Sequence, residues 1–316
     1  MPSVPLLVAC GVTLTVLLLC IGVWLESRAL THPDGYRQPD PDTFQYAETP
    51  ETEAGLAYDE IAFPVASGEI VRGWLVPAAQ AETELAVVAL HGRGGDRRGT
   101  LGHLRMLHDL GASVLLIDMR ENGLSDGQGR GMALGIREAE DASAAALELR
   151  RRGFDKVIVF GCSLGGSAAI IAAAQDKSIN GVIAESAIAG FDAFVAEVAD
   201  NRLNRFGVKA EWATRLWGRM VLAVTRWRTG LDAFTAPDAA IGKIGVRPTL
   251  LIHGARDSLV SMAHAHALER SSGSNTELWE IDDAGHCDGF GLAAAEYRSR
   301  VAALIDQVRA GETVIE

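Results

Sequence analysis

The feature that most constrains the fold of this chain is a regular alternation of short apolar segments with longer amphipathic segments after residue 58. Short continuous apolar runs are typical of strands buried on both faces, and apolar residues three or four positions apart are typical of helices. Such alternation predicts a mostly parallel, doubly wound α/β sheet that begins with an antiparallel hairpin around residues 66–68. We expect strands at 61–65, 70–76, 85–90, 113–118, 156–160, 179–184, 249–253 and 277–281, and helices at 101–110, 134–152, 164–175, 262–271 and 292–308.

Ligands of such sheets bind beyond the carboxyl ends of the strands, so the residues after each strand are the candidates for chemistry. Gly161-Cys162-Ser163-Leu164-Gly165 follows one strand and opens an alanine-rich helix. A Gly-x-Ser-x-Gly pattern between a strand and a helix is typical of a nucleophile elbow, whose tight turn exposes the serine. A glycine-rich phosphate-binding turn is the alternative. The flanking segments favour Ser163 as a nucleophile.

A serine hydroxyl needs a general base, and the base needs an orienting carboxylate. Asp257 and His286 each follow a predicted strand, and the chain order Ser, Asp, His is the one expected in this architecture. Glu185, after another strand, is the alternative carboxylate. We predict Ser163, Asp257 and His286 as the catalytic residues. No cluster of His, Asp and Glu residues has the spacing of metal ligands, so we predict no metal site.

A tetrahedral oxyanion needs hydrogen-bond donors. We predict the backbone N–H of Leu164, which follows the nucleophile, and the N–H of Arg93 in the loop His91-Gly92-Arg93-Gly94-Gly95. A phosphate cradle is the alternative for that loop, but the loop lacks the Gly-Lys-Ser/Thr ending of a P-loop.

These elements resemble the α/β-hydrolase superfamily over residues 58–310, and most of all its serine aminopeptidase-like and dienelactone-hydrolase-like branch, which includes membrane-anchored members. The loop from Asp118 to Ser125 is similar to the family's Asp-x-Arg-Gly-x-Gly-x-Ser loop, with Glu-Asn-Gly where Gly-x-Gly is usual. The resemblance implies an α/β-hydrolase domain over residues 58–316, with a helical cap insertion at about 186–236. It also implies hydrolysis of an ester, thioester or amide without a cofactor.

The first thirty residues contain a charge-free run from Val4 to Leu25 that is long enough to span a membrane as a helix. We predict a transmembrane anchor over residues 1–30, with a cleaved signal segment (Ser27-Arg28-Ala29) and a lipoprotein signal (ending at Cys10) as alternatives. Flanking arginines favour a cytoplasmic domain. A single N-terminal anchor more often exports its domain, and we expect the extracytoplasmic side. Residues 31–57 are acidic and proline-rich and predict an extended tether.

The net charge of -12 argues against a general nucleic-acid binder, and four scattered cysteines predict free thiols, including Cys162 and Cys287 beside the site. Residues 201–230, by contrast, carry seven basic residues and one acid. Apolar residues recur there every four positions from Trp212 to Val224. This helix either packs its apolar stripe on the domain or docks on anionic lipid.

The sequence therefore predicts a membrane-tethered serine hydrolase that cleaves a carboxylic ester or thioester through an acyl-enzyme. The expected partners are a small acyl ester or lipid-like substrate and the membrane, with no nucleic acid and no cofactor. A peptidase of the aminopeptidase-like branch is the first alternative, and a non-enzymatic membrane-tethered binding protein is the second.

Overall fold

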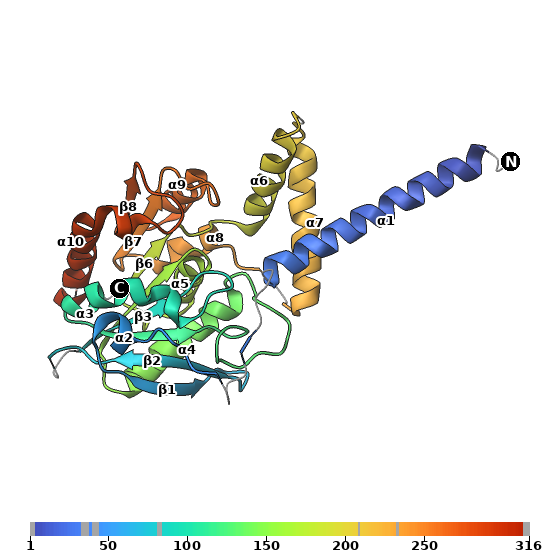
Figure 1. The fold of residues 1–316 in the computed structure, drawn as a ribbon. Coiled ribbons are helices and arrows are strands. Elements are labelled where there is room, and N and C mark those ends of the chain that lie inside the picture. Colours follow the sequence, from blue (N-terminus) through green and yellow to red (C-terminus); the bar gives the residue numbers. More distant parts are fainter. Residues whose placement is uncertain are drawn as a thin grey trace.

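The computed structural model describes residues 4–32, 38–39, 44–80, 84–207, 209–231 and 234–311. Its core is an eight-stranded sheet in the order β1-β2-β4-β3-β5-β6-β7-β8 (Figure 1). β2 pairs antiparallel with β1 and with β4, and every other pairing is parallel. The strands are β1 Asp59–Pro64, β2 Ile70–Val76, β3 Leu85–Leu90, β4 Ser113–Asp118, β5 Lys156–Cys162, β6 Gly181–Glu185, β7 Thr249–Gly254 and β8 Thr276–Ile281. This confirms the predicted fold class.

Helices cover both faces of the sheet because the central strands are apolar on both sides. In β3, Ala86, Val88 and Leu90 face one buried cluster, and the alternate residues face the other. Helices α4, α5, α8 and α9 pack in the first cluster, and α3 and α10 pack in the second. The bounds are α3 Leu101–Asp109, α4 Ile136–Arg151, α5 Leu164–Gln175, α8 Pro237–Ile241, α9 Met262–Ser271 and α10 Gly289–Ala310, with short 3-10 turns at Arg97–Thr100 and Gly242–Ile244.

The segment between β6 and α8 forms two helices, α6 Phe191–Asn204 and α7 Glu211–Thr229, which pack against each other and are called the cap hairpin below. The first three residues of the apolar row of α7 face outward: Trp212 is 77% exposed, Leu216 51% and Met220 37%. The side of α7 that packs inward carries small residues, including Gly218 and Val221. Val224 at the end of the row packs against a buried apolar cluster, as do Trp217 and Val221 on the neighbouring side. The apolar residues of this helix therefore pack on the domain only in part.

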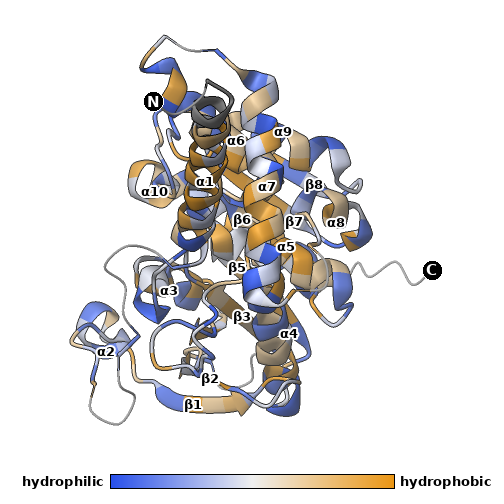
Figure 2. Ribbon diagram, turned by 90° about the vertical axis from the view of Figure 1, so that its right-hand side faces the viewer, coloured by the Kyte–Doolittle hydropathy of each residue, from blue (hydrophilic) through white to orange (hydrophobic). Residues whose placement is uncertain are grey.

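The N-terminal helix α1 spans Val4–Thr31. By length and composition, its part from Ala9 to Thr31 is the one helix of the described chain that could cross a membrane, although a signal sequence has the same features. The N-terminal part extends away from the rest of the molecule, whereas the C-terminal part lies against α7 (Figures 1 and 2). Val23, Ser27 and Leu30 are buried there.

The acidic segment after α1 differs from the expected extended tether in its second half. Residues 33–37 and 40–43 lie outside the described residues. From Phe44 onward the chain is docked, because the buried Tyr46 donates a hydrogen bond to Asp118 (2.9 Å) and packs edge-on against Trp74. A short helix, α2 Pro50–Ala54, then contacts α3. Phe44 and Tyr46 are two aromatic residues in an acidic, proline-rich stretch, so composition did not predict this anchoring point.

Candidate active site

Ser163 lies in the tight turn between β5 and α5, with φ 55° and ψ −119°. A positive φ is rare for a residue with a side chain and is found where the surrounding structure holds strain at a functional position. The turn requires its glycines. A Cβ on Gly161 would lie 2.3 Å from the carbonyl carbon of Gly165, and a Cβ on Gly165 would lie 2.5 Å from the Leu90 oxygen. The turn thus has the geometry of a nucleophile elbow.

Asp257 and His286 lie on the loops after β7 and β8 and are paired. His286 Nδ1 lies 2.7 Å from Asp257 Oδ2, and the Asp257 side chain is fully buried. Asp257 Oδ1 accepts two backbone hydrogen bonds, from Leu259 and Val260, both at 2.9 Å. Burial acts to raise the pKa of Asp257, but the hydrogen bonds from His286 and Val260 lower it below its usual value. The ionised carboxylate accepts the Nδ1 proton, so in the neutral ring Nε2 of His286 carries no proton.

Glu185, the alternative carboxylate, has other partners. Its oxygens accept hydrogen bonds from the Gly289 N–H and the Tyr297 hydroxyl, both at 2.9 Å. Burial, with the nearby charge of Cys287, raises the pKa of Glu185 to about 7. Glu185 therefore ties the start and middle of α10 to the end of β6, and the geometry favours Asp257 as the carboxylate that orients His286.

The thiols of Cys162 and Cys287 are both free, as expected. Cys287 has φ 53°, and its N–H donates to Ser186 Oγ at 3.1 Å. A hydrogen bond with Cys162 and the proximity of His286 lower the pKa of Cys287. Burial acts to lower the pKa of His286, but hydrogen bonds with Asp257 and Cys287 outweigh it and raise that pKa. Cys287 is therefore close enough to His286 to raise its pKa, a proximity that its position in the sequence did not indicate.

The loop after β3 lies beside the elbow, because a Cβ on Gly92 would be 3.7 Å from the Ser163 Cβ. The fully buried ring of His91 holds this loop: Nδ1 lies 2.8 Å from the Gly92 oxygen, and Nε2 lies 3.1 Å from the Met119 nitrogen. Burial lowers the pKa of His91 and keeps the ring neutral, so one nitrogen donates and the other accepts. Sequence reasoning identified the loop but missed His91 as the residue that positions it.

The structure therefore brings the predicted residues to one edge of the sheet. Ser163, Asp257 and His286 follow β5, β7 and β8, which run parallel. Leu164 is the first residue of α5, where backbone N–H groups have no partner within the helix. Arg93 lies next to Gly92, and its guanidinium donates to the Ala29 oxygen of α1 at 2.8 Å.

A family model described as the alpha/beta hydrolase family matches residues 87–303. This chain belongs to that family.

Solved alpha/beta hydrolase structures share the fold. Esterase Pf2001 of Pyrococcus furiosus is 22% identical with a TM-score of 0.66, over 86% of this chain and 99% of the esterase. The alpha/beta hydrolase GrgF from Penicillium sp. sh18 is 19% identical with a TM-score of 0.63, over 81% of this chain and all of GrgF (100%). At these identities the likeness establishes the fold.

Two curated relatives match part of the chain. The polyketide transferase af380 of Aspergillus fumigatus is 30% identical over 138 residues, 42% of this chain and 47% of that protein. The quorum-quenching protein AidA of Acinetobacter baumannii is 29% identical over 184 residues, 55% of this chain and 59% of AidA. The chain spans about half the length of the curated relatives it matches.

The loop Asp118–Ser125 of this alpha/beta hydrolase departs from the family pattern at Glu121, and the contacts of Glu121 show how the loop accommodates it. Glu121 replaces the usual glycine and has φ 67°, a conformation that favours glycine. Its carboxylate accepts hydrogen bonds from the N–H groups of Gln128 (2.8 Å), Gly129 (3.1 Å) and Arg130 (3.2 Å), which hold it there. Glu121 therefore braces this loop through its side chain, and Ser163, Asp257 and His286 lie on other loops.

A buried apolar cluster joins the elbow to the cap hairpin and to α1. It contains residues from the C-terminal part of α1, from both cap helices, from the loop after β7 and from the start of α5: Val23, Leu30, Met132, Leu134, Leu164, Ile188, Phe191, Val195, Val221 and Val260. The end of α1 thus packs in the same cluster as Leu164, the residue after Ser163. Sequence reasoning treated α1 as an anchor separate from the catalytic domain.

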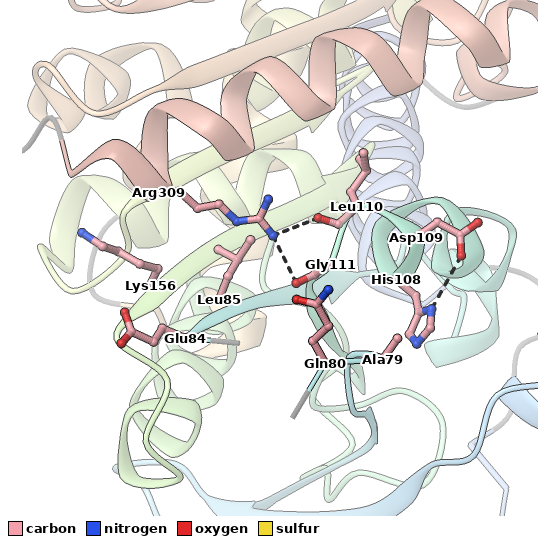
Figure 3. Close-up of a pocket in the computed structure, with 10 residues that line it drawn as sticks. All are labelled: Ala79, Gln80, Glu84, Leu85, His108, Asp109, Leu110, Gly111, Lys156 and Arg309. Carbon is pink, nitrogen blue, oxygen red and sulfur yellow. Dashed lines mark hydrogen bonds and ion pairs between the residues drawn. The ribbon is translucent and has the colours of Figure 1, made fainter. Parts of the chain in front are cut away.

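A cavity of about 750 Å³ lies at the opposite edge of the sheet, near the first residues of β3 and β5 (Figure 3). Its lining is largely polar and includes Glu84, Lys156 and Arg309. The Arg309 guanidinium already donates to the Leu110 oxygen (2.9 Å) and the Gly111 oxygen (3.2 Å). Because the amino ends of the strands form this edge, the cavity is remote from the elbow.

Among the described residues, one group could hold a metal: a nitrogen of His103, the Cys162 thiol and an oxygen of Glu185 lie within 4.8 Å of one another. They come from α3, β5 and β6, so sequence spacing could not reveal them. Glu185 already satisfies both oxygens with Gly289 and Tyr297. Its raised pKa also disfavours the ionised form that a metal would need.

Proposed function

We propose that this alpha/beta hydrolase is a membrane-anchored serine hydrolase that cleaves a carboxylic ester or thioester through an acyl-enzyme. The observation that carries the proposal is the 2.7 Å pair of His286 and buried Asp257, on the sheet edge where Ser163 occupies a strained elbow. The predicted order Ser, Asp, His and the esterase structural neighbours support it.

In the proposed reaction, His286 Nε2 takes the Ser163 hydroxyl proton as the oxygen attacks the substrate carbonyl. The N–H groups of Leu164 and Arg93 stabilise the tetrahedral oxyanion. Collapse breaks the ester bond, and His286 gives its proton to the leaving alcohol or thiol. A water molecule then loses a proton to His286 as it attacks the acyl-enzyme, and the returned proton restores Ser163 as the acid is released.

We also propose that α1 stays attached as a transmembrane anchor. Cleavage after Ala29 would remove Val23 and Ser27 from the folded protein. Ser27 Oγ is hydrogen-bonded to Thr225 (3.0 Å) and Arg228 (3.1 Å) of α7, and Arg93 of the oxyanion loop donates to the Ala29 oxygen. A segment with this many contacts to the catalytic domain behaves as part of it.

Ser163→Ala in the full-length protein tests the function. We expect it to abolish turnover of p-nitrophenyl butyrate and labelling by a fluorophosphonate probe, with an unchanged thermal midpoint. Ser299→Ala, an exposed serine on α10, is the matched control and should behave as wild type. Labelling or turnover that survives in Ser163→Ala would refute the nucleophile, and faster cleavage of an aminoacyl p-nitroanilide than of the ester would favour the peptidase alternative.

A further inference from the structure

We propose that the seam between α1 and the cap hairpin is a binding groove for the acyl chain of a bilayer lipid, through which a lipid-like substrate reaches the site. The proposal rests on the membrane-anchored hydrolase proposed above. A cavity of about 300 Å³ lies in this seam and is lined by Ala199 and Leu203 of α6 and by Ala213 and Trp217 of α7. Glu26 of α1 and Arg202 complete its edge.

The lining of the groove suits a hydrocarbon chain. Its polar members already have partners: Arg202 Nη1 lies 2.6 Å from Glu26 Oε2, and Thr214 Oγ1 donates to Asp200 at 2.8 Å. The rest of the lining, which is free to contact a ligand, consists of the apolar side chains of two alanines, a leucine and a tryptophan. Burying apolar surface in such a site is favourable, whereas a polar ligand would find few groups left to pair with.

The position of the groove along α1 matches the edge of a bilayer. The Trp217 ring packs on Gly22, where a Cβ would lie 2.8 Å from the ring. Gly22 is near the end of the charge-free run, and Glu26 is the first charged residue after it. Since a helix rises about 1.5 Å per residue, the groove spans about 6 Å of α1 at the level where acyl chains meet headgroups.

The surface around the groove also fits a membrane interface with anionic lipid. Phe206, Trp212 and Trp227 of the cap hairpin are each at least 77% exposed. Seven basic residues and one acid lie in residues 201–230. Aromatic rings are enriched at headgroup level, and clustered cations attract anionic headgroups. The cap hairpin lies beside α1 in both views, so an α1 that crosses the bilayer holds these side chains close to its surface (Figures 1 and 2).

Trp217, which lines the groove, packs against the apolar cluster that reaches the residue after Ser163. Val23 of α1 and Val221 of α7 belong to the same buried apolar cluster as Phe191 and Val195 of α6 and Leu164, the residue after Ser163. A chain held in the groove therefore lies at one end of a continuous apolar region whose other end is the elbow. We expect long-chain esters presented in a bilayer to depend on the groove, and short soluble esters to be independent of it.

The test fills the groove. Ala213→Phe places a ring in the cavity, and Ala223→Phe makes the same change on an exposed position of α7. Both full-length variants are compared in nanodiscs of phosphatidylcholine and phosphatidylglycerol. We expect Ala213→Phe to lower kcat/KM for p-nitrophenyl palmitate about 10- to 100-fold, with p-nitrophenyl butyrate turnover retained, and Ala223→Phe to change neither. Ala199→Phe fills the same cavity from α6 and should reproduce the effect if Ala213→Phe folds poorly.

A second measurement is independent of hydrolysis. Phosphatidylglycerol with a photoreactive diazirine in its acyl chain is crosslinked to wild type, Ser163→Ala, Ala213→Phe and Ala223→Phe, and α6–α7 peptides are identified by mass spectrometry. Crosslinks should be lost in Ala213→Phe alone. Equal crosslinking in Ala213→Phe would overturn the groove. Lost crosslinking with an unchanged ratio of palmitate to butyrate turnover would overturn substrate access, because the groove would then hold a structural lipid. If wild type cleaves neither ester, the proposed function fails while crosslinking still decides the groove.

Discussion

Replacing Asp257 with asparagine tests the proposed triad most directly, because the structure fixes how the new side chain must sit. Asp257 Oδ1 accepts the N–H groups of Leu259 and Val260. The asparagine must keep its carbonyl oxygen there, since an NH₂ group would face two donors. Its Nδ2 then replaces the Oδ2 atom that lies 2.7 Å from His286 Nδ1. A donor at this place requires an unprotonated Nδ1, so the proton of the neutral ring moves to Nε2.

The magnitude follows from this change of tautomer. With its proton on Nε2, His286 cannot accept the Ser163 proton, and the equivalent substitution in a serine protease lowers kcat about 10⁴-fold. We expect a similar loss of kcat/KM here, which corresponds to about 5 kcal/mol of transition-state stabilisation. The fold should survive because both backbone hydrogen bonds and the shape of the side chain are kept.

The assay is p-nitrophenyl butyrate hydrolysis by the full-length protein, with the thermal midpoint measured in parallel. Asp283→Asn is the matched control: it makes the same chemical change at a carboxylate that is 71% exposed and pairs with Arg256. We expect it to stay within about two-fold of wild type. Glu185→Gln should cost far less than Asp257→Asn. A loss below about ten-fold in Asp257→Asn, or the larger loss in Glu185→Gln, would refute the assignment of the orienting carboxylate.

Two further perturbations follow from the geometry of the elbow and of His286. Gly165→Ala should destabilise the protein by about 1–3 kcal/mol and lower activity, because its Cβ would meet the Leu90 and His91 oxygens. Gly102→Ala on α3 is the control: it has open space around it and should stabilise the protein by up to about 1 kcal/mol. Urea unfolding measures the change in the free energy of unfolding for both variants. The kcat/KM of the wild type should rise with pH as His286 loses its proton, with a midpoint above the ordinary histidine pKa. Cys287→Ala should move this midpoint to lower pH, because the variant lacks a group that raises the pKa of His286. An unmoved midpoint in a pH–rate profile of Cys287→Ala would contradict that account.

The fold could be predicted closely because the signals for it are local. The run Leu85–Leu90 is apolar at every position, and all six residues are buried as β3. The helix predicted at 164–175 and the strand predicted at 113–118 have the observed bounds, since a glycine or polar turn marks each end. The sheet order, with β4 on the outer side of β3, is long-range information. It comes from the right-handed connections of the fold rather than from any one segment.

A site residue could be predicted from the sequence only where a residue type suited to catalysis also directly follows a predicted strand. Ser163, Asp257 and His286 meet that condition. His91 does not reveal its role, because the Met119 N–H that it accepts belongs to a strand end 28 positions away. The choice between Asp257 and Glu185 also depended on side-chain direction. Asp257 follows a strand and Glu185 ends one, but only the structure shows which carboxylate faces His286 and which faces Tyr297.

The cap hairpin shows why an amphipathic pattern alone does not say which face is buried. In α7 the large residues Trp212 and Leu216 face outward, while Thr214, Gly218 and Val221 pack inward. Small residues are needed on the inner face because α6 approaches closely: a Cβ on Gly218 would lie 2.6 Å from the Asp192 oxygen. An exposed row of large apolar side chains has a free-energy cost in water that contact with a membrane removes. The burial pattern thus supports the proposed membrane anchoring, in which the cap hairpin lies at the bilayer surface and the end of α1 packs in the apolar cluster that includes Leu164.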